Sequence, residues 1–309
     1  MTNGSIRFGL CCIFKEQPIK FRRSTAKYLS QFPVVEQRNR LSDICLTNSS
    51  SLLKALAFCR QNNINGFRIN SQILPLKTHP QFGYDILDLP QAGQIIDNFK
   101  ACGELSRKYD IRTSFHPDQF IVLSSVNPEV VKRSISELQY QAELCQWVNA
   151  DVINIHAGGV YNDKQSALKR LRKVIDTLPD YVRKHLTLEN DDKSYSPKDL
   201  LPVCKDMSIP LVYDIHHHRC FKDDLSIKEA THLSVCTWNR EPLFHISSPI
   251  GGWQATNIRS HHDYININDF PRFWMSMNLT IEVEAKAKEL AVLKLMAEVH
   301  GNRTHPGRY

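Results

Sequence analysis

Leu-Val-Tyr-Asp-Ile-His-His-His, residues 211 to 218, joins a short apolar run to one carboxylate and three imidazoles. The run follows Pro210, and its polar side chains begin at Asp214. This pattern is typical of a barrel strand that carries functional groups at its C-terminal end. Five other apolar stretches of the chain also end in a histidine or a glutamate, so the same arrangement is repeated along the sequence.

Short apolar strands alternate with helical segments along the chain. Strands are predicted at 6–12, 66–71, 111–116, 152–156, 186–189, 211–214, 242–245 and 279–284. Helices are predicted at 51–62, 92–109, 127–149, within 164–185, and at 197–207, 226–235, 268–275 and 285–300. Strictly alternating strands and helices favour a parallel sheet. Eight such units predict an α/β fold, a single-domain (β/α)8 TIM barrel, with a doubly wound open sheet as the alternative.

Charge and length suggest one domain with a basic segment near its start. The 309 residues are 42% hydrophobic and carry a formal charge of +7. We expect one domain over residues 1–309, with residues 1–5 prone to disorder and residues 13–50 forming a long basic loop after the first strand. A modest positive charge fits nucleic-acid binding, although proteins without such a partner are often equally basic. Candidate phosphate-binding groups are Arg22, Arg23, Arg259 and Lys286, and the alternative is a merely solvated surface.

The cellular setting follows from what the sequence lacks. It has no apolar run long enough to cross a bilayer, and Lys15 and Glu16 interrupt the region where a signal peptide would be apolar. Nine cysteines without a C-x-x-C pair predict reduced thiols rather than a disulfide framework. We therefore expect a monomer in the reducing cytoplasm, associated with the nucleoid and not with a membrane.

Six successive predicted strands end in residues that can bind a metal. Because the C-terminal ends of barrel strands line one shared mouth, these side chains are expected to converge. Imidazole suits transition metals, and carboxylates suit manganese, magnesium and zinc. A single catalytic zinc needs about three protein ligands, so this number of candidates indicates two or three ions. Neighbouring ions are a common device for cleaving phosphodiesters. The strand-end candidates are His116, His156, Glu189, Asp214, His245 and Glu284.

Each candidate ligand taken alone also has a structural explanation that needs no metal. A single strand-end histidine is often structural, and the triple histidine can be a solvated run. Glu189 can pair with Lys193, and Glu284 with Lys286. Six such coincidences on successive strands are much less expected than one shared site. Among His261, His262 and Asp263, we rank His261 first as a further ligand and Asp263 second.

A series of motifs resembles the UV damage endonucleases. The motifs occur in order over residues 7 to about 290, and together they are highly specific. They are Arg-Phe-Gly-Leu-Cys-Cys at 7–12, Phe-Arg-Ile at 67–69, His-Pro at 79–80, Phe-His-Pro-Asp-Gln-Phe at 115–120, Asn-Ile-His-Ala-Gly-Gly at 154–159, Leu-Glu-Asn-Asp at 188–191, Asp-Ile-His-His at 214–217, His-Ile-Ser-Ser at 245–248 and Val-Glu-Ala-Lys at 283–286.

The resemblance implies a metal-dependent endonuclease on a TIM barrel related to apurinic endonuclease IV. Such enzymes nick double-stranded DNA immediately 5′ to ultraviolet photoproducts, cyclobutane dimers and 6-4 photoproducts, leaving a 3′-hydroxyl and a 5′-phosphate. It implies a cluster of two or three divalent ions, manganese first, with zinc, magnesium or cobalt as alternatives. It also implies a catalytic role for His79 near the cluster or the scissile phosphate. We expect Glu189 to be catalytic as the carboxylate that bridges the ions, because it lies in the middle of the ligand series. The implied ligands are His116, His156, Glu189, Asp214, His217, His245, His261 and Glu284.

The chain departs from the family at several positions. The family probes the lesion with a Gln-Tyr pair, and here the pair is Gln119 and Phe120, which keeps the flat ring but loses the hydroxyl. Leu10 and Phe14 stand where some members carry Tyr and Asn, and we expect them to be apolar probes. Leu243 replaces a lysine that can be carboxylated in some members, so a carboxylated lysine at that position is impossible here.

Three other functions stay open from the sequence. One is a metal-dependent sugar isomerase, since such barrels also place Glu, Asp and His at strand ends. Another is an apurinic-site endonuclease without photoproduct preference, and the third is a lesion-binding protein without catalysis. The histidine-rich ligand set favours the nuclease over the isomerase.

Overall fold

The computed structural model describes residues 4–301, which form eight strands with helices between them. The strands are β1 (Ile6–Cys11), β2 (Gly66–Ile69), β3 (Arg112–Phe115), β4 (Ala150–His156), β5 (Leu186–Glu189), β6 (Leu211–Val212), β7 (Leu243–Ile246) and β8 (Leu279–Val283). The helices are α1 (Ala26–Leu29), α2 (Val34–Gln61), α3 (Ala92–Lys108), α4 (Pro128–Val148), α5 (Lys164–Asp176), α6 (Asp180–Arg183), α7 (Pro197–Met207), α8 (Ile215–Cys220), α9 (Ile227–Val235) and α10 (Glu289–Gly301), with 3-10 turns η1 (Ile86–Asp88), η2 (Ile267–Asp269) and η3 (Arg272–Ser276).

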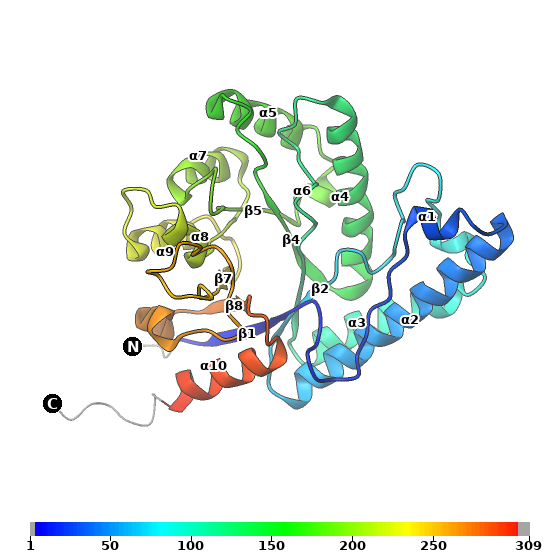
Figure 1. Ribbon diagram of the computed structural model, residues 1–309, viewed down its shortest axis with the longest axis horizontal. Helices are drawn as coiled ribbons and strands as arrows, with labels where there is room; N and C mark the ends of the chain where they lie inside the picture. The colour runs from blue at the N-terminus through cyan, green and yellow to red at the C-terminus, as the bar shows by residue number, and fades with distance from the viewer. Residues whose placement is uncertain (1–3, 302–309) are drawn as a thin grey trace.

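All eight strands pair in parallel, in the order β6-β5-β4-β3-β2-β1-β8-β7. A parallel bridge between Asp214 and His245 joins the two ends of this order, and the backbone N–H of His245 donates to the carbonyl of Tyr213 at 3.1 Å. Figure 1 shows the helices around the strands, with α2, α3 and α4 together on one side and α7, α8 and α9 on the other. The predicted single-domain TIM barrel is therefore confirmed.

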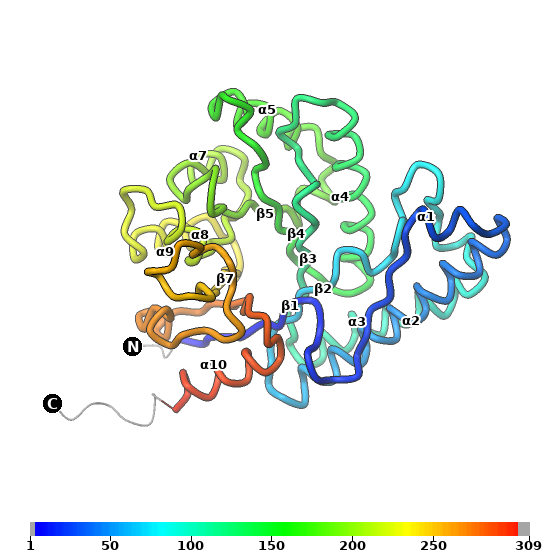
Figure 2. The backbone as a smooth tube through the Cα atoms, in the orientation of Figure 1, coloured from blue at the N-terminus to red at the C-terminus, as the bar shows by residue number. Residues whose placement is uncertain are grey.

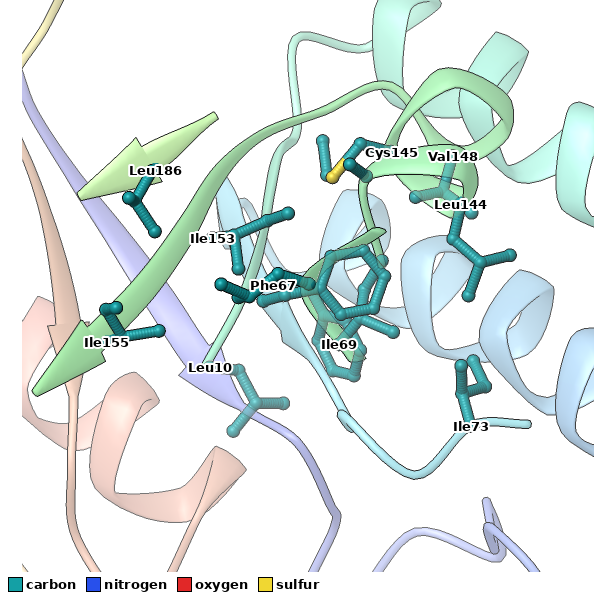
Figure 3. Packing of buried hydrophobic residues seen from close by; sticks show 14 of the residues in the cluster. Leu10, Phe67, Ile69, Ile73, Leu144, Cys145, Val148, Ile153, Ile155 and Leu186 are labelled. Atoms are coloured by element: carbon teal, nitrogen blue, oxygen red, sulfur yellow. The ribbon is translucent and has the colours of Figure 1, made fainter. Parts of the chain in front are cut away.

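Alternate strand residues face opposite sides of the barrel wall. Phe67 and Ile69 on β2, and Ile153 on β4, pack outward against Leu144 and Val148 of α4 (Figure 3). Residues at the intervening positions point into the barrel, because successive side chains of a strand alternate in direction. Val152, Val212 and Leu243 form a separate small cluster there. Along β4, β6 and β7 the interior is thus apolar at this level, and the buried polar side chains of Asn154, Asp214 and His245 follow two residues later.

The segment after β1 differs from its prediction. Residues 13–50 are not one long loop, because α1 and α2 lie within them and α2 begins at Val34, 17 residues before the predicted start at Ser51. The spacing of apolar residues did not reveal the first half of α2, because the buried face of this helix includes the polar residues Ser42, Asn48 and Ser49. Their polarity is offset by hydrogen bonds: Asn48 donates to the carbonyls of Arg22 and Ile73.

Smaller differences from the prediction concern the end of β6, the last third of the chain and the N-terminal residues. The predicted strand at 211–214 ends at Val212, and the predicted helix at 268–275 is two 3-10 turns. Residues 1–3 of the segment expected to be disordered lie outside the described residues, whereas the Ser5 backbone N–H donates to Asn278 Oδ1 at 2.9 Å. Between residues 4 and 301, no helix has the length and apolarity that a membrane span requires.

Two glycines lie opposite each other in β1 and β2, where the barrel interior is crowded. Gly9 pairs with Gly66, and a Cβ added to Gly66 would lie 2.9 Å from the Cα of Gly9. A Cβ added to Gly9 would lie 3.1 Å from Cγ of Glu282 on β8. The absence of both side chains leaves room for the charged groups of the neighbouring strands.

We predict that Gly66→Ala destabilises the fold by about 1–3 kcal/mol, because the added methyl overpacks a backbone contact. Chemical denaturation followed by circular dichroism measures the change. Gly93→Ala on α3 is the matched control, since nothing lies within 4 Å of its added Cβ and alanine favours a helix. Equal effects of the two substitutions would contradict the packing argument.

Candidate active site

Seven of the eight predicted ligands converge on one end of the barrel. Their side chains form three groups whose potential ligand atoms lie within 4.8 Å of one another: His116 with His156 and Glu189, His116 with His245 and Glu284, and Glu189 with Asp214 and His217. Each residue lies at or just beyond the C-terminal end of a strand, with His245 the penultimate residue of β7 and Asp214 two residues beyond β6. The shared members, His116 and Glu189, link the three groups into one cluster.

Glu189 lies in the middle of the cluster. Its Oε2 is 2.9 Å from Nε2 of His116, and its Oε1 is 3.2 Å from Nδ1 of His217 and 3.1 Å from Nδ1 of His245. Asn154 on β4 donates to Oε2 at 2.5 Å, and Thr187 in turn donates to Oδ1 of that amide at 3.0 Å. This chain of hydrogen bonds fixes the orientation of the carboxylate.

The three consecutive histidines lie in a short helix, α8, that was not predicted from the sequence. Asp214 caps α8 by accepting the backbone N–H of His217 at 2.7 Å, and the helix then directs the three rings differently. His217 joins the cluster, with Nδ1 3.0 Å from the carbonyl of Asn190. His218 instead contacts Tyr213 at 2.8 Å and Asp223 at 3.0 Å. His216 is buried against the Trp253 ring.

The candidate ligands that follow β7 in the sequence differ in their distance from the cluster. Glu284 Oε1 is 3.5 Å from Nδ1 of His245, and Glu284 Oε2 is 3.8 Å from Nδ1 of His261. His261 therefore lies beside the cluster, although it belongs to none of the three groups among residues 4–301. Asp263 is exposed and is likewise outside these groups, and its backbone carbonyl accepts from Ala287.

The donor set fits a divalent metal. Oδ2 of Asp214 and Nδ1 of His156 are buried, and neither has a hydrogen-bond partner within residues 4–301. Buried polar atoms without partners are costly, and a metal ion would give both atoms a bonding partner. Imidazole nitrogens and carboxylate oxygens are the ligands that manganese, zinc and related ions accept.

The pKa values reflect the same crowding of charge. Burial lowers the pKa of His156, which leaves a neutral ring with a free lone pair. Burial opposes protonation of His245 too, but the Glu189 carboxylate outweighs it and raises the pKa of His245 to about 10. Burial alone would raise the pKa of Glu189, yet the surrounding imidazoles hold it well below its usual value. The site therefore attracts positive charge strongly, whether from protons or from metal ions.

Several residues of the site were missed by the sequence analysis, which considered only strand ends. Arg68, Ser114 and Glu282 lie within β2, β3 and β8, and all three are buried. The usable signal was the period of two: Arg68 stands between Phe67 and Ile69, which face outward, so its side chain must point into the barrel.

A cleft of about 610 Å³ opens beside the cluster. Its lining includes His116, His261 and Glu284 as well as Arg23 and Lys286, two of the four phosphate-binding candidates. The other two are absent from this lining among the described residues: Arg22 is exposed next to Arg23, and Arg259 lies 3.4 Å from Asp192.

The segment that carries Arg23 is held in place by buried polar groups. Buried Glu289 accepts the backbone N–H groups of Lys15, Glu16 and Gln17, and Ser51 donates to the carbonyl of Lys20. Figure 2 shows this segment leaving β1 and running along α2 to α1. Arg23 is therefore presented to the cleft by an ordered segment.

The residues expected to probe DNA have different surroundings. Phe120 is 74% exposed, and together with Gln119 it lines a second cavity of about 520 Å³. Leu10 and Phe14 were wrongly assigned as probes, because both are buried in the hydrophobic core. Leu10 faces the helices beside Phe67, its partner on β2, and Phe14 packs against the rings of Phe58 and Phe67.

His79 lies in the connection between β2 and η1. Its Nδ1 accepts the backbone N–H groups of Gln81 at 3.2 Å and Phe82 at 3.3 Å, so the ring proton is on Nε2. His79 is outside the three ligand groups of the described residues. Its role toward the phosphate stays a prediction.

Fold and site together define a TIM-barrel protein with a candidate metal site at the mouth formed by its strand ends. The chain belongs to the family described as UV-endonuclease UvdE, which matches residues 6–305. It is 33% identical to the UV DNA damage endonuclease of Bacillus velezensis, over 96% of this chain and 95% of that protein. The crystal structure of SacUVDE superposes with a TM-score of 0.85 at 28% identity, covering 97% of this chain and all of that one.

A more distant structure shares the fold alone. Endonuclease IV from Thermus thermophilus has a TM-score of 0.59 at 12% identity, with 96% of this chain and 98% of that chain covered. Membership of the UV-endonuclease family makes the chain a DNA repair endonuclease, a hydrolase of phosphodiester bonds whose substrate is DNA. The sugar-isomerase and non-catalytic alternatives are thereby set aside.

We predict that Mn²⁺ raises the melting temperature of the wild-type protein and that Asp214→Asn abolishes most of this rise. Asparagine can still cap α8, but its amide nitrogen replaces one carboxylate oxygen. An ion present at 100 times its dissociation constant stabilises the folded state by about 2.7 kcal/mol, and the variant should lose most of this increment. Melting curves with Mn²⁺ and with chelator measure it.

Asp163→Asn is the matched control, because Asp163 caps α5 in the same way and belongs to none of the ligand groups of the described residues. An equal rise in melting temperature for wild type and Asp214→Asn would remove Asp214 from the ligand set.

Proposed function

We propose that the protein nicks double-stranded DNA immediately 5′ to ultraviolet photoproducts, with two or three divalent ions as cofactor and manganese preferred. The products are a 3′-hydroxyl and a 5′-phosphate. The observation that carries this proposal is the set of three ligand groups joined through His116 and Glu189. Groups that share ligands in this way support neighbouring ions, as in enzymes that hydrolyse phosphodiesters.

The proposed ligands are His116, His156, Glu189, Asp214, His217, His245, His261 and Glu284. When bound, divalent ions activate water and neutralise charge that develops on the phosphate. Glu189 holds the centre of the cluster, fixed by its hydrogen bond from Asn154. The buried carboxylates need no solvent reorganisation when they act, which is the advantage of a preorganised site.

Phosphate binding falls to the cations that line the cleft. Arg23 precedes all the proposed ligands in the sequence and Lys286 follows them, yet both line the cleft together with Glu284. Both side chains are exposed and line the cleft, so they can reach phosphate oxygens. Such contacts set the position of DNA on the protein and carry no sequence information.

Lesion recognition is assigned to the turn after β3. A photoproduct is poorly stacked and paired, so extruding it costs less than extruding a normal base. The exposed ring of Phe120 fills the gap that extrusion leaves, and Gln119 offers hydrogen bonds to unpaired base edges. Recognition then depends on how easily the DNA deforms rather than on its sequence.

The first test is nicking of supercoiled plasmid by the monomeric protein. Irradiated plasmid with Mn²⁺ should be nicked, and chelator or unirradiated plasmid should prevent nicking. Glu189→Gln should reduce the rate by at least about 10²-fold, because it removes a charged group preorganised at the reaction centre. Glu104→Gln on the exposed side of α3 is the control.

Equal nicking of irradiated and unirradiated plasmid would contradict photoproduct specificity. Faster nicking of depurinated than of irradiated plasmid would indicate an apurinic-site endonuclease instead. Full activity of Glu189→Gln would contradict the central role of that carboxylate.

A second prediction concerns the aromatic wedge. Phe120→Ala should slow nicking of irradiated plasmid by about 10-fold or more, since base–aromatic stacking contributes about 1–3 kcal/mol per base. Leu87→Ala is a matched control, because Leu87 on η1 is also 74% exposed and apolar. If both variants nick at the wild-type rate, Phe120 is an ordinary surface residue.

A further inference from the structure

A buried carboxylate that is not among the predicted ligands lies directly beneath the cluster. Glu282 is in the middle of β8, where it pairs with His245 of β7 and Gly9 of β1. Its side chain is 3% exposed, and it points into the barrel at the level where Gly9 leaves space. A carboxylate buried this deeply needs a specific set of partners.

Both oxygens of Glu282 are occupied by groups of the barrel wall. Ser114 on β3 donates to Oε1. Nε and a terminal nitrogen of Arg68 lie 2.5 Å from Oε2, and the other terminal nitrogen of Arg68 lies 2.6 Å from Oε1 of Glu284. Ser114 and Arg68 thus hold both oxygens of Glu282, and Arg68 also restrains one of the proposed ligands, Glu284.

The neighbours of the His245 ring indicate which nitrogen is available to a metal. Nε2 of His245 lies 3.1 Å from Oε2 of Glu282 and 2.9 Å from a terminal nitrogen of Arg68. Nδ1 of the same ring faces the other carboxylates, at 3.1 Å from Glu189 and 3.9 Å from Asp214. Nδ1 is therefore the nitrogen on the metal side.

The position of the ring proton of His245 indicates a role for Glu282. A histidine that coordinates through Nδ1 carries its ring proton on Nε2, and this proton needs an acceptor. Arginine only donates, so of the two neighbours of Nε2 only Glu282 can accept. The contact between Arg68 and Nε2 then becomes proximity without a hydrogen bond.

We infer that Glu282, held by Arg68 and Ser114, is a positioning residue. Its carboxylate accepts a hydrogen bond from the Nε2–H group of His245, and this orients Nδ1 of the ring toward a metal ion. Such carboxylate–histidine–metal arrangements fix the ring and increase its basicity. Arg68 balances the charge of Glu282, which keeps that carboxylate a hydrogen-bond acceptor rather than a competing ligand. The inference rests on the metal dependence of the proposed function.

The test measures Mn²⁺ binding without DNA, by the loss of the free-ion electron paramagnetic resonance signal during titration. Glu282→Gln should raise the dissociation constant of at least one bound ion by about 10- to 100-fold, the usual effect of removing such a partner. Glu241→Gln is the matched control, because Glu241 also binds an arginine, Arg7, and contacts β8, but at the far end of the barrel. Its binding should equal that of wild type.

A spectroscopic measurement separates positioning from a merely structural role. In Zn²⁺-loaded wild type, ring-nitrogen NMR of His245, assigned with a His245→Asn variant, should show the proton on Nε2. A proton on Nδ1, with Nε2 accepting from Arg68, would overturn the inference. Wild-type Mn²⁺ affinity in Glu282→Gln would overturn it as well.

A second variant covers the case in which Glu282→Gln does not fold. Replacing both partners, Arg68→Met with Glu282→Met, exchanges a buried ion pair for apolar groups of similar volume, which proteins often tolerate. This variant should show the same weakened Mn²⁺ binding, and unchanged binding would overturn the inference. Plasmid nicking by wild type tests the proposed function independently, so either hypothesis can fail alone.

Discussion

The mutual repulsion of buried carboxylates is the constraint on which this barrel depends. Glu189, Asp214 and Glu282 are buried in one interior, Glu284 lies at its edge with 14% of its side chain exposed, and Arg68 is the permanent cation that contacts two of these carboxylates. Burying like charges together is costly in a low-dielectric interior unless opposite charge accompanies them. Protonated imidazoles or divalent ions must supply the remainder. Metal binding and the stability of the barrel mouth are therefore coupled, since the same charge balance governs both.

Other parts of the fold meet the requirements of this charged interior. The paired glycines of β1 and β2 leave space, and Ser114 and Asn154 donate hydrogen bonds to carboxylates. Glu289 shows the same principle away from the cluster, because its buried carboxylate binds three consecutive backbone N–H groups. Those contacts order the segment that leads to Arg23. Polar groups in the core thus build the site and also shape the surface beside it.

The strand-end ligands were predictable from the sequence because two simple rules converge there. Strands alternate apolar and polar residues, and the C-terminal ends of parallel barrel strands share one mouth. Residues such as Arg68 and Glu282 were not identified, because mid-strand charges in a barrel look like errors in an apolar pattern until the fold is known. The start of α2 was missed for a related reason: Asn48 is buried, but only its partners in another segment make it acceptable there.

Strand direction also explains where the resemblance did not transfer. Leu10 lies between Gly9 and Cys11, and its register with Phe67 places it on the helix-facing side of β1, so it cannot reach DNA. Leu243 is different, because it points into the barrel and packs with Val152 and Val212 one layer below His245. At the level of His245 itself, β8 supplies Glu282. A carboxylate partner for this histidine is therefore present in the barrel wall without a modified lysine, and an apolar residue at 243 completes the layer beneath it.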